Sequence, residues 1–114
     1  MAAGKYDFKI EQGATFSRQV TWTDSTGTAI NLTGYTVSGK VRKKYTDNTP
    51  LATFTCTITN AAGGIFTFAL TATQTAALVS TGVQEGIYDI EASISGTVYR
   101  ILEGVVTISP EVTR

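Results

Sequence analysis

The feature that most constrains the fold is an alternation of apolar and polar residues that recurs in short runs along the chain. In one run Tyr35, Val37 and Val41 alternate with polar residues, and in another Phe66 and Phe68 do so. Successive side chains of a β-strand point to opposite faces, so each run predicts a strand with one buried and one exposed face. Runs of this kind occupy about residues 8–11, 15–23, 35–42, 54–58, 66–70, 88–94 and 98–108.

Turn signals separate these runs at intervals of roughly ten residues, the spacing of a β-sandwich or a small barrel. Asn60–Gly64 joins two runs of the same phase and predicts a β-hairpin. Residues 72–79 lack the alternation and contain helix formers, which predicts about one or two helical turns that begin at Thr71 or Thr73 and cross between sheets. We therefore expect an all-β sandwich of about seven strands with one short helical crossover, in one domain spanning residues 1–114.

Several individual residues allow more specific predictions within these strands and turns. Trp22 is expected to anchor the core, and Arg18, which falls on the apolar side of its run, either lies at a sheet edge or extends its stem to solvent. Gly39 predicts a bulge or a close neighbour, and Gly104 predicts a bulge that changes the phase of the last strand. The segment Leu32-Thr-Gly-Tyr35 predicts a turn in which the glycine has a positive φ.

Charge and composition restrict the partners. Nine basic and nine acidic residues cancel, so the chain has no overall field that attracts nucleic acid or an anionic membrane, and we expect neither as a partner. A net charge near zero also removes one barrier to self-association, and we expect a homo-oligomer or several copies in an assembly. The first residues lack the apolar core of a signal peptide, and no stretch approaches the length of a membrane span.

The residue types of enzyme sites are scarce. The sequence has no histidine and a single cysteine, Cys56, whose place in an alternating run is typical of a small buried hydrophobe. We therefore predict no catalytic, cofactor-binding or metal-binding residues, and a protein that is not an enzyme. Asp89 and Glu91 are the one carboxylate pair to weigh: such a pair can do acid–base work or hold a cation, but it also suits the solvent side of a half-buried strand.

One charged cluster is a candidate for partner contact. It comprises Lys40, Arg42, Lys43, Lys44 and Tyr45. A basic cluster beside an aromatic residue can contact nucleic acid or an acidic neighbouring subunit. It can equally be a solvated strand end whose lysines protect a sheet edge from aggregation.

Four stretches together carry a resemblance to a known family. They are Phe8–Phe16, Ile30–Thr36 leading to Val41 and Arg42, Tyr88–Glu91, and Arg100–Arg114. With these stretches the chain resembles small proteins encoded in the structural gene clusters of tailed phages and prophages. It is also distantly similar to the immunoglobulin-like N-terminal domain of phage upper-baseplate proteins.

The resemblance implies an immunoglobulin-like sandwich that docks on other phage structural proteins in the virion, after assembly in the bacterial cytoplasm. Its place would be that of a capsid cement or decoration protein, or of a tail or baseplate adaptor, and both remain open. Arg100 and Glu103 are expected to pair with charges across the sheet, and the loop at residues 79–86 is a further candidate for partner contact. The alternative is a host-surface module that binds carbohydrate through Tyr6, Tyr45 and Tyr99.

Overall fold

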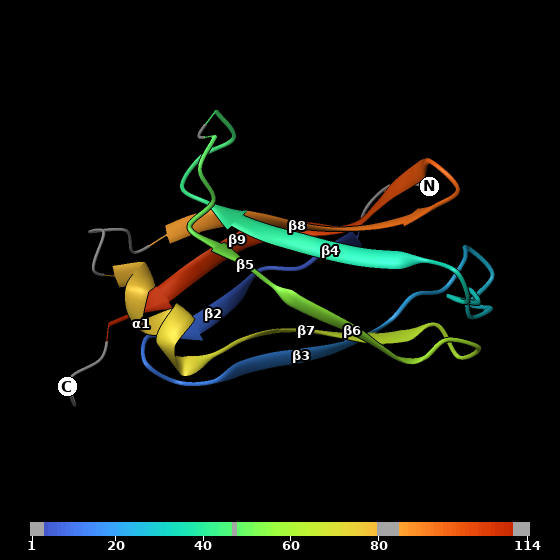
Figure 1. Ribbon diagram of the computed structural model, residues 1–114, viewed down its shortest axis with the longest axis horizontal. Coiled ribbons are helices and arrows are strands. Elements are labelled where there is room, and N and C mark those ends of the chain that lie inside the picture. Colours follow the sequence, from blue (N-terminus) through green and yellow to red (C-terminus); the bar gives the residue numbers. More distant parts are fainter. Residues whose placement is uncertain (1–3, 47, 80–84, 111–114) are drawn as a thin grey trace.

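The computed structural model describes residues 4–46, 48–79 and 85–110. They form two β-sheets that pack face to face, with one short helix at one end of the sandwich (Figure 1). The larger sheet contains β1 (Gly4–Lys5), β2 (Phe8–Glu11), β4 (Thr36–Arg42), β5 (Ala52–Thr53), β8 (Glu85–Ile94) and β9 (Thr97–Ser109). The smaller sheet contains β3 (Phe16–Thr21), β6 (Thr55–Asn60) and β7 (Ile65–Leu70), and the helix is α1 (Ala72–Val79).

The order of the larger sheet is β1-β9-β8-β4-β5, with β2 also paired to β9, and that of the smaller sheet is β3-β7-β6. β1 and β2 run parallel to β9, whereas the other pairs are antiparallel. β3, β7 and β6 face β4, β8 and β9, which is the division of strands found in immunoglobulin-like sandwiches. The predicted all-β sandwich is confirmed.

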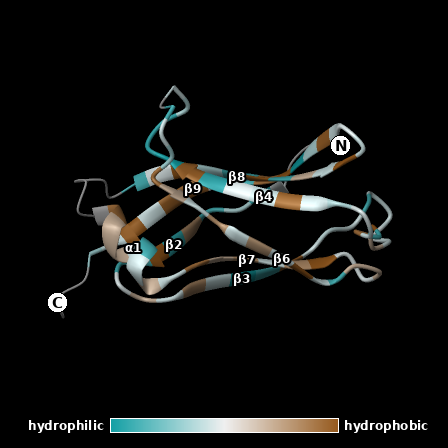
Figure 2. Ribbon diagram, in the orientation of Figure 1, coloured by the Kyte–Doolittle hydropathy of each residue, from teal (hydrophilic) through white to brown (hydrophobic). Residues whose placement is uncertain are grey.

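An aromatic cluster fills the space between the sheets. Phe8 and Tyr88 come from the larger sheet, Phe16 and Phe68 from the smaller one, and Phe54 from the point where the chain crosses between them. Ring centroids lie 4.7 Å apart for Phe8 and Tyr88, and 5.0 Å apart for Phe54 and Phe68. Hydrophobic and hydrophilic residues alternate along β4 (Figure 2), so the same alternation that predicts the strands also builds this core.

The predicted connections are found where expected. β6 and β7 form the hairpin closed by residues 61–64, and α1 carries the chain from the smaller sheet to the larger one. Thr71 caps the helix in a reciprocal pair: Gln74 N donates to Thr71 Oγ1 at 3.2 Å, and Thr71 N donates to Gln74 Oε1 at 2.9 Å. The described residues contain nine strands rather than about seven, because β1 and β5 have only two residues each and show no alternation.

Three predictions are confirmed, at Trp22, at the turn before β4 and at Arg18. Trp22 is buried, and the ring of Tyr35 meets it edge to face at 5.7 Å. The turn before β4 has Gly34 at φ 85°, closed by a hydrogen bond from Tyr35 N to Leu32 O. Arg18 lies on β3, an edge strand, which is the first of the two alternatives expected for it, and its guanidinium lies over the Phe16 ring, 4.6 Å from the centroid.

The prediction of a bulge at Gly104 is wrong. β8 and β9 change register between Ile90 and Glu91, which pair with Leu102 and Arg100, so Ile101 is the extra residue. Gly104 is glycine for another reason: a Cβ there would meet the backbone of Tyr6 in the segment between β1 and β2. A change of phase in the alternation identifies the strand that contains a bulge but not the position of the bulge. A glycine in that strand does not locate it, because glycine also occurs where another segment of backbone packs closely against the strand.

At Gly39 the close neighbour is confirmed. A Cβ there would collide with the side chain of Ile90 and would lie 3.2 Å from Phe54 Cδ2. Glycine thus lets β4, β8 and the crossing at Phe54 pack together at the centre of the sandwich. No helix in the described ranges is long and apolar enough to cross a bilayer.

Candidate interaction surface

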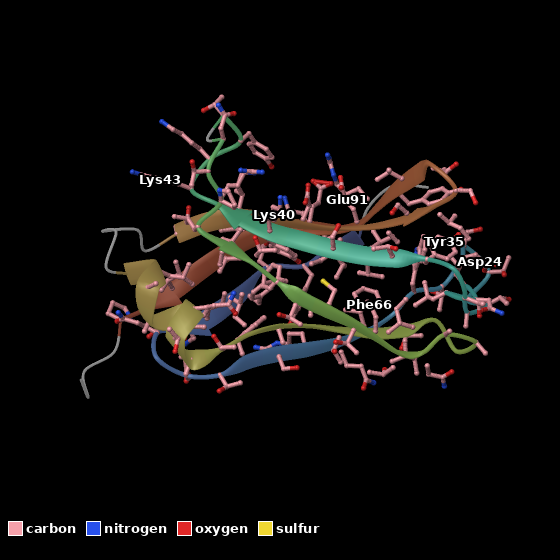
Figure 3. The ribbon with its side chains drawn as sticks, in the orientation of Figure 1. Asp24, Tyr35, Lys40, Lys43, Phe66 and Glu91 are labelled. Carbon is pink, nitrogen blue, oxygen red and sulfur yellow. The ribbon has the colours of Figure 1, made fainter. Side chains whose placement is uncertain are left out.

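The outer side of the larger sheet carries a patch of charged and polar side chains from three neighbouring strands. Alternation along β4, β8 and β9 turns one set of side chains into the core and the other set outward. We call the charged and polar members of the outward set that line a hollow there the charged face: Ser38, Lys40, Arg42, Asp89, Glu91, Arg100 and Glu103. Lys40 and Glu91 project from this side of the sheet, whereas Phe66 lies between the two sheets (Figure 3).

The charges of this face are arranged strand by strand. β4 contributes the bases Lys40 and Arg42, and β8 contributes the acids Asp89 and Glu91. Lys40 lies opposite Asp89 in the register of the two strands. Because β9 adds Arg100 and Glu103, three bases and three acids line the face, and its formal charge cancels locally.

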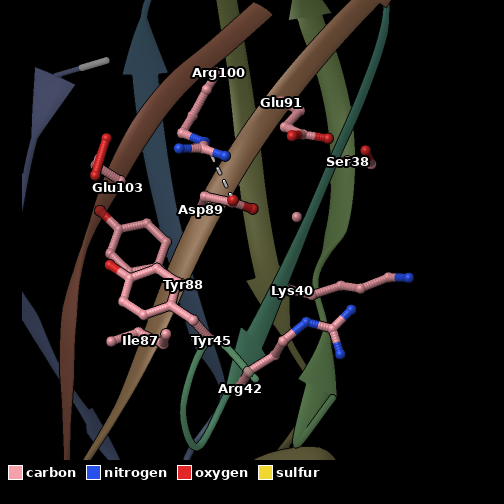
Figure 4. Close-up of a pocket in the computed structure, with 11 residues that line it drawn as sticks. Ser38, Lys40, Arg42, Tyr45, Ile87, Tyr88, Asp89, Glu91, Arg100 and Glu103 are labelled. Carbon is pink, nitrogen blue, oxygen red and sulfur yellow. Dashed lines mark ion pairs between the residues drawn. The ribbon is translucent and has the colours of Figure 1, made fainter. Parts of the chain in front are cut away.

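The charged face surrounds an open hollow of about 350 Å³, shown in Figure 4. Arg100 Nε and Asp89 Oδ2 are 3.4 Å apart across it, with side-chain exposures of 54% and 39%. An ion pair this exposed contributes little to stability, about 0.2–1 kcal/mol. Its charges therefore remain available to reorganise around a charged or polar partner.

The predicted basic cluster divides between the hollow and a loop. Lys40, Arg42 and Tyr45 line the hollow, whereas Lys43 and Lys44 lie exposed beyond the end of β4 and are not part of its lining. Arg42 Nη1 donates to Asn48 O at 3.0 Å, which ties the end of β4 to the loop that follows it. The side chain of Tyr45 is strongly exposed, at 82%.

The position of the acidic residues relative to the basic ones depends on the register between β4, β8 and β9. Asp89 and Glu91 lie on the solvent side of β8, as one interpretation of the sequence proposed, and Asp89 pairs with Arg100 as expected for that arginine. For Glu103 the described residues show no ion pair. In the part of the chain that the structure describes, no group of three or more His, Cys, Asp or Glu side chains is placed to hold a metal. One signal in the sequence could have revealed this surface. The charged residues of β4 and β8 all occupy the polar positions of their alternating runs, so they lie on the same side of the sheet once the two strands pair.

Two ionisable groups lie inside the sandwich: Cys56 is half-buried and Tyr88 is buried. Cys56 packs against the core, and burial raises the pKa of its thiol to about 11, which disfavours the reactive thiolate at neutral pH. The Tyr88 hydroxyl donates to Tyr6 O; burial above all, and then the nearby acidic groups of Tyr6, Asp7 and Glu103, raise its pKa. Both groups act in packing and tethering in this structure.

The three tyrosines considered for carbohydrate binding do not converge. Tyr6 packs on Phe8, with centroids 5.5 Å apart, and Tyr99 packs on Trp22 at 5.8 Å. Tyr6 lies between β1 and β2, Tyr99 on β9, and Tyr45 in the loop after β4. Of the three, only Tyr45 lines the hollow.

The outer side of the smaller sheet has a different character. Its outward side chains are Ser17, Gln19, Thr21, Thr55, Thr57, Ile65, Thr67 and Ala69, which we call the threonine face. No member is charged, and the register places Thr57 beside Thr67 in its middle. The other predicted contact segment, residues 79–86, falls largely outside the described residues, which omit 80–84.

Comparison with known proteins finds no protein family whose profile matches this sequence, and no curated protein that is significantly similar to it.

Proposed function

We propose that this chain is a structural protein of a tailed-phage particle, which docks on other virion proteins through its charged face. The observation that carries the proposal is the hollow in the outer side of the larger sheet, where bases on β4 stand beside acids on β8. The resemblance of four stretches of the sequence to phage structural proteins supports the same role. Capsid decoration and tail or baseplate adaptor are both compatible with such a surface.

Physical chemistry favours contact over catalysis here. Alternating charges across an interface fix the orientation of a partner and exclude wrong ones more than they add affinity. The chain has no histidine, and its one thiol has a pKa raised by burial to about 11. A docking domain needs neither a general base nor a nucleophile.

The first test is whether the chain is a component of the phage particle. Mass spectrometry of purified particles from a strain that carries the gene should find the chain in stoichiometric amounts. Absence of the chain from the particles overturns the proposal.

The second test addresses the surface. Particles assembled without the chain should bind added wild-type protein, and the double variant Lys40→Glu/Arg42→Glu should bind roughly tenfold more weakly or worse. The matched control, Gln19→Glu/Thr21→Glu, changes two exposed positions of the threonine face. Equal loss in both variants would contradict docking through the charged face.

A second candidate function is binding of host-surface carbohydrate, and one observation favours it. The hollow combines the exposed ring of Tyr45 with the carboxylates of Asp89 and Glu91, and sugars bind to aromatic rings flanked by hydrogen-bonding groups. A glycan array that detects binding by the wild type but not by Tyr45→Ala would establish it. An array without binding removes this candidate and leaves the docking role untouched.

A further inference from the structure

The exposed edges of the two sheets are protected unequally. An edge strand offers unpaired backbone groups to any other strand, and proteins block edges with charges, prolines or very short strands. β2 carries Lys9 and Glu11, and β5 has only two residues. On β3, Arg18 covers its own edge by donating from Nη1 to Ser17 O at 2.9 Å. β6 is six residues long and has neither a charged residue nor a proline.

The ladder of the smaller sheet shows which groups of β6 lie at its open edge. In an antiparallel pair, the N–H and C=O of one residue point to the same side, and successive residues alternate. Trp22 N donates to Gly64 O, so the backbone groups of Gly64 point toward β3. Phe66, two residues on, has the same orientation, and the backbone groups of Thr67 therefore point toward β6. Thr57 lies opposite Thr67, so its backbone groups pair with β7.

The backbone groups of Cys56 and Ile58 therefore point away from β7. The same parity holds for Phe54, whose N–H is turned away from β7 and donates to Gly39 O on β4 at 2.9 Å. Beyond Phe54, β6 diverges from β4 (Figure 1). Among the described residues, no backbone hydrogen bond joins Cys56 or Ile58 to another strand on this side.

The sequence of β6 suits pairing with itself. Thr55-Cys56-Thr57-Ile58-Thr59 reads almost the same in both directions about Thr57. In an antiparallel pair centred on Thr57, threonine faces threonine on the outer side. On the inner side Cys56 of each copy faces Ile58 of the other, and both of these side chains are half-buried and pack on the core.

We propose that β6 pairs with β6 of a second copy of this chain, antiparallel and about a two-fold axis at Thr57. Each Cys56 exchanges both backbone hydrogen bonds with Ile58 of the other copy, so the four groups that point outward on each strand are satisfied. The two smaller sheets join into one, ordered β3-β7-β6-β6-β7-β3, whose outer side is a continuous threonine face. The bulge at Thr59 limits the pairing to about residues 55–59.

Cross-linking tests the register directly. Thr57 faces Thr57 of the other copy in a non-hydrogen-bonded pair, with Cα atoms about 4.5 Å apart, which permits a disulfide. In a Cys56→Ala background, Thr57→Cys should form a covalent dimer under mild oxidation. Thr67→Cys in the same background, on the central strand of the same face, should remain uncross-linked. Absence of the covalent dimer in the Thr57→Cys variant, or equal cross-linking at both positions, overturns the proposal.

Sedimentation tests the association in the native chain. Wild-type protein should sediment as a dimer, Thr57→Lys as a folded monomer by circular dichroism, and Thr67→Lys as a dimer. A monomeric wild type, or a dimer that Thr57→Lys leaves intact, contradicts edge pairing. If Thr57→Lys fails to fold, the cross-linking result decides. The Lys40→Glu/Arg42→Glu variant should remain dimeric, so failure of this inference and failure of the docking function are distinguishable.

Discussion

The outer faces of the two sheets differ in chemical character although the sheets share one core. The charged face gathers three bases and three acids around a hollow, whereas the threonine face has no charged member. The inner sides are alike: Phe66 and Phe68 of the smaller sheet and Ile90 of the larger one are all fully buried. The core uses the inner pattern only, so the two outer faces differ independently of it.

The largest expected effect tests whether stability resides inside the sandwich. Gly39→Val places a side chain against Ile90 and Phe54, and overpacking of this kind should lower the free energy of unfolding by about 3 kcal/mol. Thr67→Val, a change of similar shape in the middle of the threonine face, should change it by less than about 0.5 kcal/mol. Urea denaturation of both variants measures the difference. Equal midpoints would show that the outer face contributes to the fold as much as the core.

Tyr88 provides a second contrast, because it ties the segment between β1 and β2 to the larger sheet. Tyr88→Phe removes the hydrogen bond to Tyr6 O and should lower the free energy of unfolding by about 1–2 kcal/mol. The folded pKa of Tyr88 is raised, so its stabilisation is complete below the unfolded pKa of about 10 and declines as pH rises toward the folded value. Between pH 9 and 11, wild type should therefore lose more stability than Tyr88→Phe. Parallel curves would show that Tyr88 ionises equally in both states.

The smaller sheet contains the thiol, and its reactivity is the third test. With a pKa of about 11 instead of 9.0, Cys56 has roughly a hundredfold less thiolate at pH 8. The higher nucleophilicity of a more basic thiolate offsets part of this, so reaction with a disulfide reagent should be roughly tenfold slower than in the unfolded chain. Spectrophotometric titration in buffer and in denaturant compares the two rates. Equal rates would mean that Cys56 is fully open to solvent.

The smallest effect concerns the ion pair of the charged face. A double-mutant cycle with Asp89→Ala and Arg100→Ala should give a coupling of about 0.5 kcal/mol, which decreases as salt is added. A coupling above about 2 kcal/mol would show that the charged face helps to hold the fold together. The distinction between a structural inner side and an interacting outer side would then fail for the larger sheet.

Alternation and turn chemistry were enough to predict the fold, and they were not enough to predict the surface. The capping role of Thr71, the tight contact at Gly39 and the edge position of Arg18 are each one of two alternatives that the local sequence offers. The bulge at Ile101 does not, because its position depends on how β9 matches β8. The charged face depends on the same kind of information, since Lys40 and Asp89 are neighbours only through strand register.

The parallel pairing of β1 and β2 with β9 has a mechanical consequence. Gly4 pairs with Leu102 at one end of this seam, and Glu11 pairs with Ser109 at the other. A force that pulls Gly4 and Ser109 apart loads the hydrogen bonds of the seam together in shear rather than breaking them one at a time. The bond from Val105 N to Asp7 Oδ1 lies within the same seam, and the bond from the Tyr88 hydroxyl to Tyr6 O ties the segment between β1 and β2 to β8 as well. We expect this sandwich to resist tension along β9 far better than tension across its sheets.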